Sequence, residues 1–246
     1  MRAVVVLPTY NERENVRSLL SAVRQTVPAA DVLVVDDNSP DGTADLVEAT
    51  AADLGQIKVF VRPRKRGLGT AYREGFAVAL DEGYEVIVSV DVDWSHDPAV
   101  LPGLLGLIAE GADVAIGSRY VPGGATVDWP FHRRLLSRWG NRYTSFVLGL
   151  GINDCTSGYR AYRATALRAI EPSTTTAEGY AFLTELVLRH ARRGHTMAET
   201  PIVFADRRYG ASKMSTRIVV ESMLLVTRWG VQDFVTGWRR TRRRAR

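Results

Sequence analysis

Short apolar runs alternate with amphipathic stretches along the first half of the chain. The runs are rich in β-branched residues and predict buried strands; they cover residues 3–7, 31–35, 58–62, 85–90 and 113–117. The stretches between them repeat apolar residues at helical spacing and predict helices over 11–27, 41–54, 70–82 and 98–110. This alternation predicts an α/β fold with a mostly parallel, twisted sheet that carries helices on both faces.

Polar residues follow several of these strands. Pro8 is expected to end the first strand, Asp36 and Asp37 close the second, and Arg119 comes just after the fifth. Ligands of such sheets bind beyond the carboxyl ends of the strands. The sequence therefore predicts a binding site at that edge of the sheet.

The second half contains two longer amphipathic stretches, 132–150 and 216–238, in which tryptophans and arginines recur among the apolar residues. An apolar stripe on a helix usually packs against the core. Stripes rich in Trp and Arg are also typical of helices that lie in a membrane interface. We expect a catalytic domain over 1–215, followed by an amphipathic helix and a basic tail over 216–246.

The net charge of +5 comes from the end of the chain, because residues 239–246 contain six arginines. Without them 26 basic residues face 27 acidic ones, which leaves a net charge of −1. Such a tail fits attraction to an anionic membrane or to RNA, and it equally fits a solvated chain end.

The single cysteine, Cys155, excludes an internal disulfide and fits a reducing, cytosolic setting. The N-terminus does not read as a signal peptide, and no apolar stretch reaches about 18 residues, the length of a membrane-spanning helix. We expect a soluble or peripheral protein.

Two carboxylates, Asp91 and Asp93, directly follow the fourth strand. Residues i and i+2 at a strand end point the same way, so both side chains can address one cation. Oxygen ligands suit Mg²⁺ or Mn²⁺, which also bind diphosphate oxygens. A turn without any metal is the alternative interpretation of this short motif.

Other residues predict contacts with a nucleotide and its phosphates. Asp37 can accept from a ribose or a base, Tyr10 can stack on the base, and Glu12 can accept hydrogen bonds. The cations Arg119, Arg133, Arg207, Arg208 and Lys213 suit phosphates, and the last three belong to a predicted loop that can act as a lid. Each residue alone is also compatible with a structural or solvated role. No Ser-His-Asp, P-loop or zinc spacing occurs, and we expect His190 and His195 to be surface or capping residues.

Taken in order, the motifs resemble the family-2 glycosyltransferases, and more narrowly the dolichol-phosphate (polyprenol-phosphate) mannose synthases. The resemblance covers about residues 3 to 215 and rests on the segments 8–12, 34–43, 65–72, 91–98, 117–120, 154–160 and 207–213.

The resemblance implies a GT-A fold, a GDP-mannose donor and a polyprenyl-phosphate acceptor. It assigns donor binding to Pro8, Tyr10, Glu12, Val35, Asp37, Asp91, Val92, Asp93, Arg207 and Lys213. It assigns the divalent metal to Asp91, Asp93 and Ser95, and the acceptor phosphate to Arg119, Arg133 and Ser137. Asp91, Asp93 and Arg119 are then the expected catalytic residues.

The chain departs from the family pattern in three places. Trp94 is bulkier than the usual aliphatic residue and affects the expected shape of the site, whereas Glu178 stands where relatives often carry a lysine that contacts phosphate. Many bacterial relatives also have C-terminal transmembrane helices, which this sequence lacks. The expected location is the cytoplasmic face of a membrane. The sequence does not show whether an integral membrane protein helps to hold the chain there.

The expected reaction is inverting mannose transfer from GDP-mannose to the lipid phosphate, with no protein general base. One alternative is a polyprenyl-phosphate glucosyltransferase that uses UDP-glucose. Another, from a different class, is a non-catalytic membrane- or RNA-binding protein led by the arginine tail. The balanced charge of the body and the carboxylates at the strand ends favour an enzyme without a nucleic-acid partner.

Overall fold

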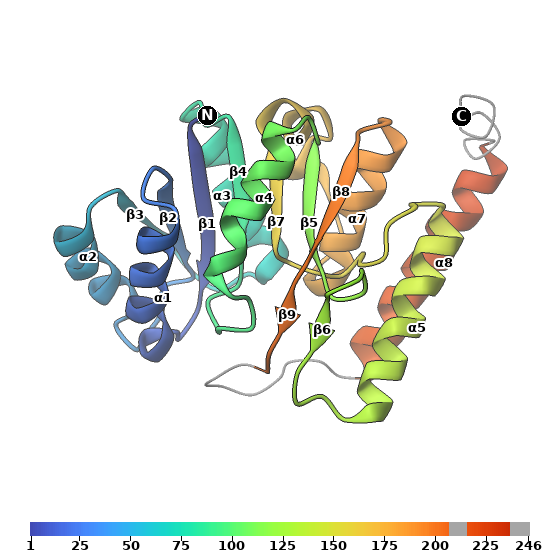
Figure 1. The fold of residues 1–246 in the computed structure, drawn as a ribbon, viewed down its shortest axis with the longest axis horizontal. Helices are drawn as coiled ribbons and strands as arrows, with labels where there is room; N and C mark the ends of the chain where they lie inside the picture. The colour runs from blue at the N-terminus through green and yellow to red at the C-terminus, as the bar shows by residue number, and fades with distance from the viewer. Residues whose placement is uncertain (207–215, 237–246) are drawn as a thin grey trace.

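The computed structural model describes residues 1–206 and 216–236 and shows a central sheet between two layers of helices (Figure 1). The seven-stranded sheet has the order β3-β2-β1-β4-β7-β5-β8. Its strands are β1 (Ala3–Thr9), β2 (Asp31–Asp36), β3 (Ile57–Val61), β4 (Val86–Ser89), β5 (Val114–Ser118), β7 (Arg160–Arg163) and β8 (Met197–Pro201). All neighbours run parallel except β7, which is antiparallel to both β4 and β5. The predicted mostly parallel α/β sheet is confirmed.

Helices cover both faces of the sheet, as predicted. One face carries α1 (Arg13–Thr26), α2 (Thr43–Leu54) and α4 (Leu101–Ala109), and the other carries α3 (Leu68–Asp81) and α7 (Gly179–Arg192). Shorter elements are η1 (Pro98–Val100), α6 (Ala164–Ala169), η2 (Pro172–Thr174) and the small parallel pair β6 (Ala125–Thr126) with β9 (Val203–Phe204).

The two hydrophobic cores follow from the alternation of side chains along a strand. In β1, Val4 and Val6 pack into the core beneath α3 and α7, whereas Val5 and Leu7 pack into the core beneath α1 and α4. All four side chains are fully buried. A strand that is covered on both faces needs a continuous apolar run, which is the pattern that identified it in the sequence.

The sequence prediction was wrong at Pro8, and it did not identify the strands β6 to β9 or the helices α6 and α7. Pro8 does not end β1, because the strand continues to Thr9 and Pro8 is paired in register with Val35. The antiparallel strand β7 was not predicted, since its polar sequence Arg-Ala-Tyr-Arg lacks an apolar run. Its position between β4 and β5 places the preceding loop, residues 153–159, next to the carboxyl ends of both strands.

The helices α5 (Phe131–Leu148) and α8 (Thr216–Val235) lie side by side at the edge of the molecule opposite β3 (Figure 1). Gly230 permits close packing, since a β-carbon there would lie 2.5 Å from Cγ1 of Val147. The hydroxyls of Tyr143 and Thr227 are hydrogen-bonded at 2.8 Å. The N-terminal end of α5 lies near the same edge of the sheet as the carboxyl ends of β4 and β5.

Candidate active site

The two carboxylates predicted to bind metal lie beyond the end of β4, at the centre of the sheet. The hydroxyl of Tyr72, from α3, donates to Oδ1 of Asp91 at 3.2 Å. Gly158 faces the same carboxylate, and a β-carbon there would lie 3.5 Å from Asp91 Oδ2. Asp93 is almost buried and accepts from the backbone N–H of Ser95 at 3.0 Å and from the Ser95 hydroxyl. Asp91, Asp93 and Ser95 thus share one segment beyond β4, and their role as metal ligands stays a prediction.

The turn after Asp93 depends on an unusual backbone conformation at Trp94. Its φ of 64° lies in the left-handed region, which costs a non-glycine residue of order 1 kcal/mol. The indole N–H donates to Ser18 of α1 at 3.1 Å, and the ring packs against the core on that face. The bulk of Trp94 is therefore directed towards α1, which accounts for the departure from the family pattern at this position.

A buried arginine organises the carboxylate at the end of β2. The side chain of Arg62 is fully buried and donates to Asp37, to Glu74 at 3.0 Å and to the Thr70 hydroxyl at 2.7 Å. Burial raises the pKa of Asp37, and the charge of Arg62 opposes that shift without cancelling it. Arg62 thus joins the ends of β2 and β3 to the start of α3, although no residue pattern singles it out.

Four more residues predicted to bind the donor, Pro8, Tyr10, Glu12 and Val35, belong to β1, to the turn after it and to β2, which ends just before Asp37. The Nζ of Lys65 lies 3.7 Å from the ring centroid of Tyr10, and Glu12 accepts from Asn15 at 2.8 Å. Pro8 is half-buried beside Val35, with which it is paired. The side chains of Val35 and Val92 belong to the core, so only their backbone atoms are able to contact a ligand.

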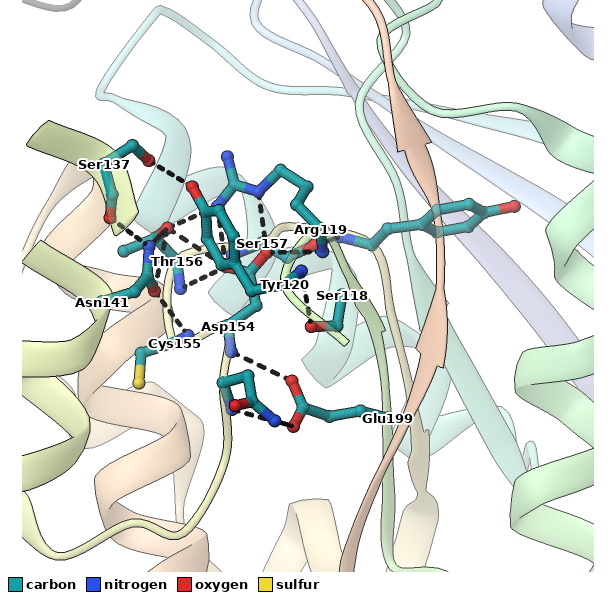
Figure 2. Close-up of polar contacts among 12 residues, drawn as sticks. Ser118, Arg119, Tyr120, Ser137, Asn141, Asp154, Cys155, Thr156, Ser157 and Glu199 are labelled. Atoms are coloured by element: carbon teal, nitrogen blue, oxygen red, sulfur yellow. Dashed lines mark hydrogen bonds and ion pairs between the residues drawn. The ribbon is translucent and has the colours of Figure 1, made fainter. Parts of the chain in front are cut away.

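Arg119, which follows β5, is fixed by a network of polar contacts (Figure 2). Its Nε and Nη2 each donate to one carboxylate oxygen of Asp154 at 2.7 Å, and Nη2 also donates to the Thr156 hydroxyl at 2.6 Å. Burial by itself raises the pKa of Asp154, but the charge and hydrogen bonds of Arg119 outweigh it and hold the pKa below its usual value. Asp154 is therefore an ionised partner that sets the orientation of the guanidinium.

Arg133 and Ser137 come from the first turns of α5 and reach the same region. The guanidinium of Arg133 lies 4.0 Å from the ring centroid of Trp129, and that of Arg119 lies 5.8 Å from it. Arg133 also pairs with Asp206 at 3.1 Å. The Ser137 hydroxyl is hydrogen-bonded to that of Tyr120, the residue after Arg119, at 2.6 Å. The structure brings the three predicted phosphate-binding residues together around Trp129 and Tyr120.

The loop over residues 153–157 is the main part of the site that residue patterns alone did not reveal. Glu199 of β8 accepts from the backbone N–H of Asn153 at 2.8 Å and from that of Asp154 at 3.0 Å. Asp154 in turn accepts from the N–H of Ser157 at 3.1 Å. The only available signal was the motif Asp-Cys-Thr-Ser-Gly-Tyr-Arg, which was recognised through the resemblance and not through its chemistry.

The lysine expected from the family pattern at position 178 is replaced by a carboxylate with a different role. Glu178 Oε1 accepts from Arg73 at 2.8 Å. Its Oε2 faces Gly69, where a β-carbon would lie only 2.8 Å away. Gly67, with a φ of 95°, forms the turn that α3 follows. Glu178 therefore packs against the glycine turn and is neutralised by Arg73.

Two histidines are buried, and for His190 this contradicts a position at the surface, one of the two that we expected. His96 contacts the rings of Tyr159 and Phe204 edge-on, and burial lowers its pKa to about 4. His190 is fully buried against Tyr162, and burial, with smaller effects of His195 and Arg160, lowers its pKa to about 3. Both imidazoles are therefore neutral at pH 7. His190 lies near the end of an amphipathic helix, where the sequence does not show which face it takes.

Arg207, Arg208 and Lys213, predicted to form a phosphate-binding lid, lie outside the described residues. So does the arginine tail over 239–246. None of the helices in the described part of the chain is both long and apolar enough to cross a bilayer.

A sheet of this order, with an aspartate pair beyond its central strand and arginines beside it, defines the GT-A class of glycosyltransferases. The chain belongs to glycosyl transferase family 2, whose profile matches residues 4–171. It is 47% identical over 231 residues to an undecaprenyl-phosphate mannosyltransferase of Micrococcus luteus, covering 94% of this chain and 95% of the relative. It is 46% identical over 232 residues to a polyprenol monophosphomannose synthase of Mycolicibacterium smegmatis, covering 94% and 88%.

Solved structures share the fold at low sequence identity. Glucosyl-3-phosphoglycerate synthase from Mycobacterium tuberculosis, in complex with Mn²⁺, UDP-glucose and phosphoglyceric acid, superposes with a TM-score of 0.65 at 20% identity, covering 92% of this chain and 79% of that one. A mannosyltransferase from Pyrobaculum calidifontis, in complex with GDP-Man and Mn²⁺, gives a TM-score of 0.61 at 19% identity, covering 92% and 62%. These similarities confirm the predicted GT-A fold.

Proposed function

We propose that this protein transfers mannose from GDP-mannose to a polyprenyl phosphate, with inversion at the anomeric carbon. The observation that carries the proposal is a site with two halves. An aspartate pair lies beyond β4, and an arginine cluster from α5 and the end of β5 lies on the other side of the intervening strand β7. The names of the two relatives at 46% and 47% identity support mannose as the sugar and a polyprenyl phosphate as the acceptor.

The donor nucleoside is assigned to the ends of β1 and β2. Tyr10 offers a ring face, while Asp37 and Glu12 offer carboxylate oxygens, and Pro8, Val35 and Val92 line the floor. Arg207 and Lys213 are assigned to the diphosphate on the basis of the family resemblance alone. The ion pair between Asp37 and Arg62 fixes the carboxylate before any ligand arrives, which reduces the ordering cost of binding.

The residues after β4 fit a divalent cation bound together with the donor. Asp91, Asp93 and Ser95 present only oxygen atoms, the ligands that Mg²⁺ and Mn²⁺ prefer. The described residues contain no cluster of three or more acidic, histidine or cysteine side chains able to hold a metal. Two carboxylates and one hydroxyl would leave coordination positions on such a cation for diphosphate oxygens. When bound, the ion neutralises the charge that develops on the leaving diphosphate.

The arginine cluster is assigned to the acceptor phosphate. Arg119, Arg133 and Ser137 supply donors to an anion that would otherwise be repelled by the donor diphosphate. A phosphate monoester loses its second proton near pH 6, so the nucleophile is already ionised at neutral pH. Its oxygen forms a bond to the anomeric carbon while the bond to the diphosphate oxygen breaks, and GDP leaves with the electron pair. Residues of the site orient the two substrates and no protein base is required.

We assign the outer face of α5 and α8 to the cytoplasmic surface of a membrane. Phe131, Leu135, Trp139 and Phe146 of α5 are exposed, as are Leu224, Val231, Phe234 and Val235 of α8. Arg134, Arg138 and Arg142 flank the stripe on α5, and such a combination suits an anionic bilayer surface. The proposed division is a catalytic domain over 1–215 and a membrane-associated segment over 216–246, with an integral membrane partner left open.

The experiment that tests the function is a donor panel. Purified protein is incubated with a short-chain polyprenyl phosphate, a divalent cation and radiolabelled GDP-mannose, GDP-glucose, UDP-glucose or UDP-mannose, and the lipid product is extracted. The account expects product from GDP-mannose and little from the other three donors. Preferential transfer from UDP-glucose would instead identify the glucosyltransferase alternative, and absence of transfer from every donor would overturn the proposed reaction.

A further inference from the structure

The three residues assigned to the acceptor phosphate belong to two separate parts of the fold. Arg119 follows β5 in the central sheet, whereas Arg133 and Ser137 lie on α5 at the edge of the molecule. A single phosphate contacts all three only if the helix keeps a fixed position relative to the strand end. Contacts that connect α5 to Arg119 therefore control the geometry of this half of the site.

Asn141 of α5 makes such a connection (Figure 2). It lies one helical turn after Ser137 and is only 2% exposed. Its Oδ1 accepts from the backbone N–H of Cys155 at 2.8 Å. Its Nδ2 donates to the Thr156 hydroxyl at 3.2 Å and to the backbone carbonyl of Ser137 at 3.0 Å. One buried amide thus contacts both the helix and the loop over residues 153–157.

Thr156 completes the path from Asn141 to Arg119. Its hydroxyl accepts hydrogen bonds from Nη2 of Arg119 at 2.6 Å and from Asn141. Asp154, two residues before Thr156, accepts from Nε and Nη2 of the same guanidinium. Asn141 is therefore separated from Arg119 by a single hydroxyl group, and from Ser137 by a single hydrogen bond.

We infer that Asn141 is a positioning residue for the acceptor phosphate, which sets the separation between Arg119 and the Arg133–Ser137 turn of α5. The inference rests on the proposed function, because it concerns the acceptor half of that site. Buried side-chain amides are well suited to this role, since a donor and an acceptor on one rigid group fix both distance and orientation. Loss of the amide should misplace one set of phosphate donors relative to the other while Asp91, Asp93 and Asp37 keep their contacts.

The test measures KM for donor and acceptor separately, with a short-chain polyprenyl phosphate in detergent. Asn141→Ala is expected to raise the acceptor KM about tenfold or more and to leave the donor KM within about twofold. Thr156→Val removes only the intervening hydroxyl at nearly constant volume, and should act in the same direction. Because both changes break one path, their effects on the acceptor KM should be less than additive in the double variant.

Thr144→Val is the matched control. Thr144 is 5% exposed, lies on the same helix after Asn141, and makes no hydrogen bond to residues 153–157 within the described part of the chain. It should lower the melting temperature slightly and leave both KM values unchanged. If Asn141→Ala lowers the melting temperature but leaves the acceptor KM unchanged, or raises both KM values equally, Asn141 is merely structural and the inference is overturned.

Arg119→Lys, which keeps the positive charge, separates this inference from the proposed function. The proposed acceptor site requires a higher acceptor KM for Arg119→Lys, whatever Asn141→Ala does. If Arg119→Lys shows that increase and Asn141→Ala does not, only the inference about Asn141 fails. If Arg119→Lys leaves the acceptor KM unchanged, the assignment of the acceptor site itself is wrong.

Discussion

At the residue scale, the site depends on charged side chains that are paired before any substrate is present. Arg119 is held by Asp154 and Asp37 is held by Arg62, and all four side chains are at most 7% exposed. A buried ion pair of this kind contributes little net stability, because desolvation offsets the attraction. Its effect here is geometric, since each pair aims a functional group at the carboxyl edge of the sheet.

Residue patterns identified Asp37 and Arg119, but not Arg62 and Asp154, the partners that hold them. Asp91, Asp93 and Arg119 were predicted because they directly follow apolar strands. Arg62 and Asp154 were not selected on chemical grounds, since a buried arginine and a surface arginine look the same in a sequence. Their roles depend on contacts between segments far apart in the chain, which periodicity and spacing do not encode.

The Arg62 cluster leads to a prediction about donor binding. Arg62→Lys keeps the charge but loses the forked contacts to Asp37, Glu74 and Thr70. We expect the donor KM to rise about tenfold, because an unrestrained Asp37 binds the nucleoside less well, while the acceptor KM stays constant. Initial-rate kinetics with each substrate varied in turn measure both values.

A control for this variant is Arg163→Lys. Arg163 pairs with Asp113 at 3.7 Å, near the amino end of β4 and therefore at the other end of the strand from the candidate site. It should change neither KM. An unchanged donor KM in Arg62→Lys would contradict the role assigned to the Asp37 carboxylate.

At the element scale, the positions of the strands in the sequence were easier to predict than the order in which the strands pair in the sheet. The five strands read as apolar runs were all found, with bounds shifted by one or two residues at most ends. β7 was missed because its charged sequence does not show a simple alternation of apolar and polar residues. Its Arg160 is nevertheless fully buried, and it donates to the backbone carbonyls of Leu183 and Cys155 at 2.7 Å each. The order of the strands follows from tertiary packing, which local patterns do not specify.

The amphipathic stretches on α5 and α8 had two interpretations, core packing and membrane contact, and the structure shows core packing for one face of the helix pair. Leu148 and Val226 are buried in the core, whereas Trp139 and Phe146 remain 54% and 81% exposed. The helices pack against each other and leave a broad apolar stripe outside. An exposed patch of this kind is typical of an interaction surface.

Binding to vesicles tests the membrane assignment. Trp139→Ser combined with Phe146→Ser should lower binding to phosphatidylglycerol vesicles about tenfold or more, because each buried apolar side chain contributes of order 1 kcal/mol. Turnover of a short-chain acceptor in detergent should change little. Co-sedimentation at several lipid concentrations gives the partition coefficients.

Val61→Ser is the matched control for the vesicle experiment, since Val61 is 44% exposed on the opposite edge of the sheet. Its binding should equal that of the unmodified protein. Equal binding by the double variant would show that another surface, such as the arginine tail, contacts the lipid.

At the scale of the whole molecule, the sequence predicted the fold class and placed the candidate residues at the carboxyl edge of the sheet. Regular alternation of strands and helices was sufficient for both, because parallel sheets place their ligand-binding residues at one edge. The loop over 153–157 and the position of α5 were not predictable in this way, since they are fixed by Glu199 and Asn141 from distant segments.

Burial of neutral histidines makes the stability of the whole protein depend on pH. The pKa of His190 is about 3 in the folded protein and has its ordinary value of about 6.5 when unfolded. The unfolded chain therefore binds a proton that the folded protein does not, and stability is lost as the pH falls below 6.5. Between pH 6.5 and 5 this amounts to about 1.5 kcal/mol for one such histidine.

Urea unfolding at pH 6.5 and pH 5 checks this expectation. His190→Phe, which keeps a ring against Tyr162, should lose about 1.5 kcal/mol less over that interval than the unmodified protein. His132→Gln changes an exposed histidine on α5 and should leave the pH dependence unaltered. An identical pH dependence in His190→Phe would show that the buried imidazole does not resist protonation.

The proposed reaction depends on a divalent cation, bound by Asp91 and Asp93, that neutralises the leaving diphosphate. The decisive measurement is mannose transfer from GDP-mannose to a polyprenyl phosphate in excess EDTA and after Mg²⁺ or Mn²⁺ is restored. We expect loss of transfer with chelator, recovery with metal, and a decrease of about a thousandfold or more in a folded Asp93→Asn variant at any metal concentration. Transfer that continues undiminished in chelator, or in Asp93→Asn, would contradict this dependence on the cation.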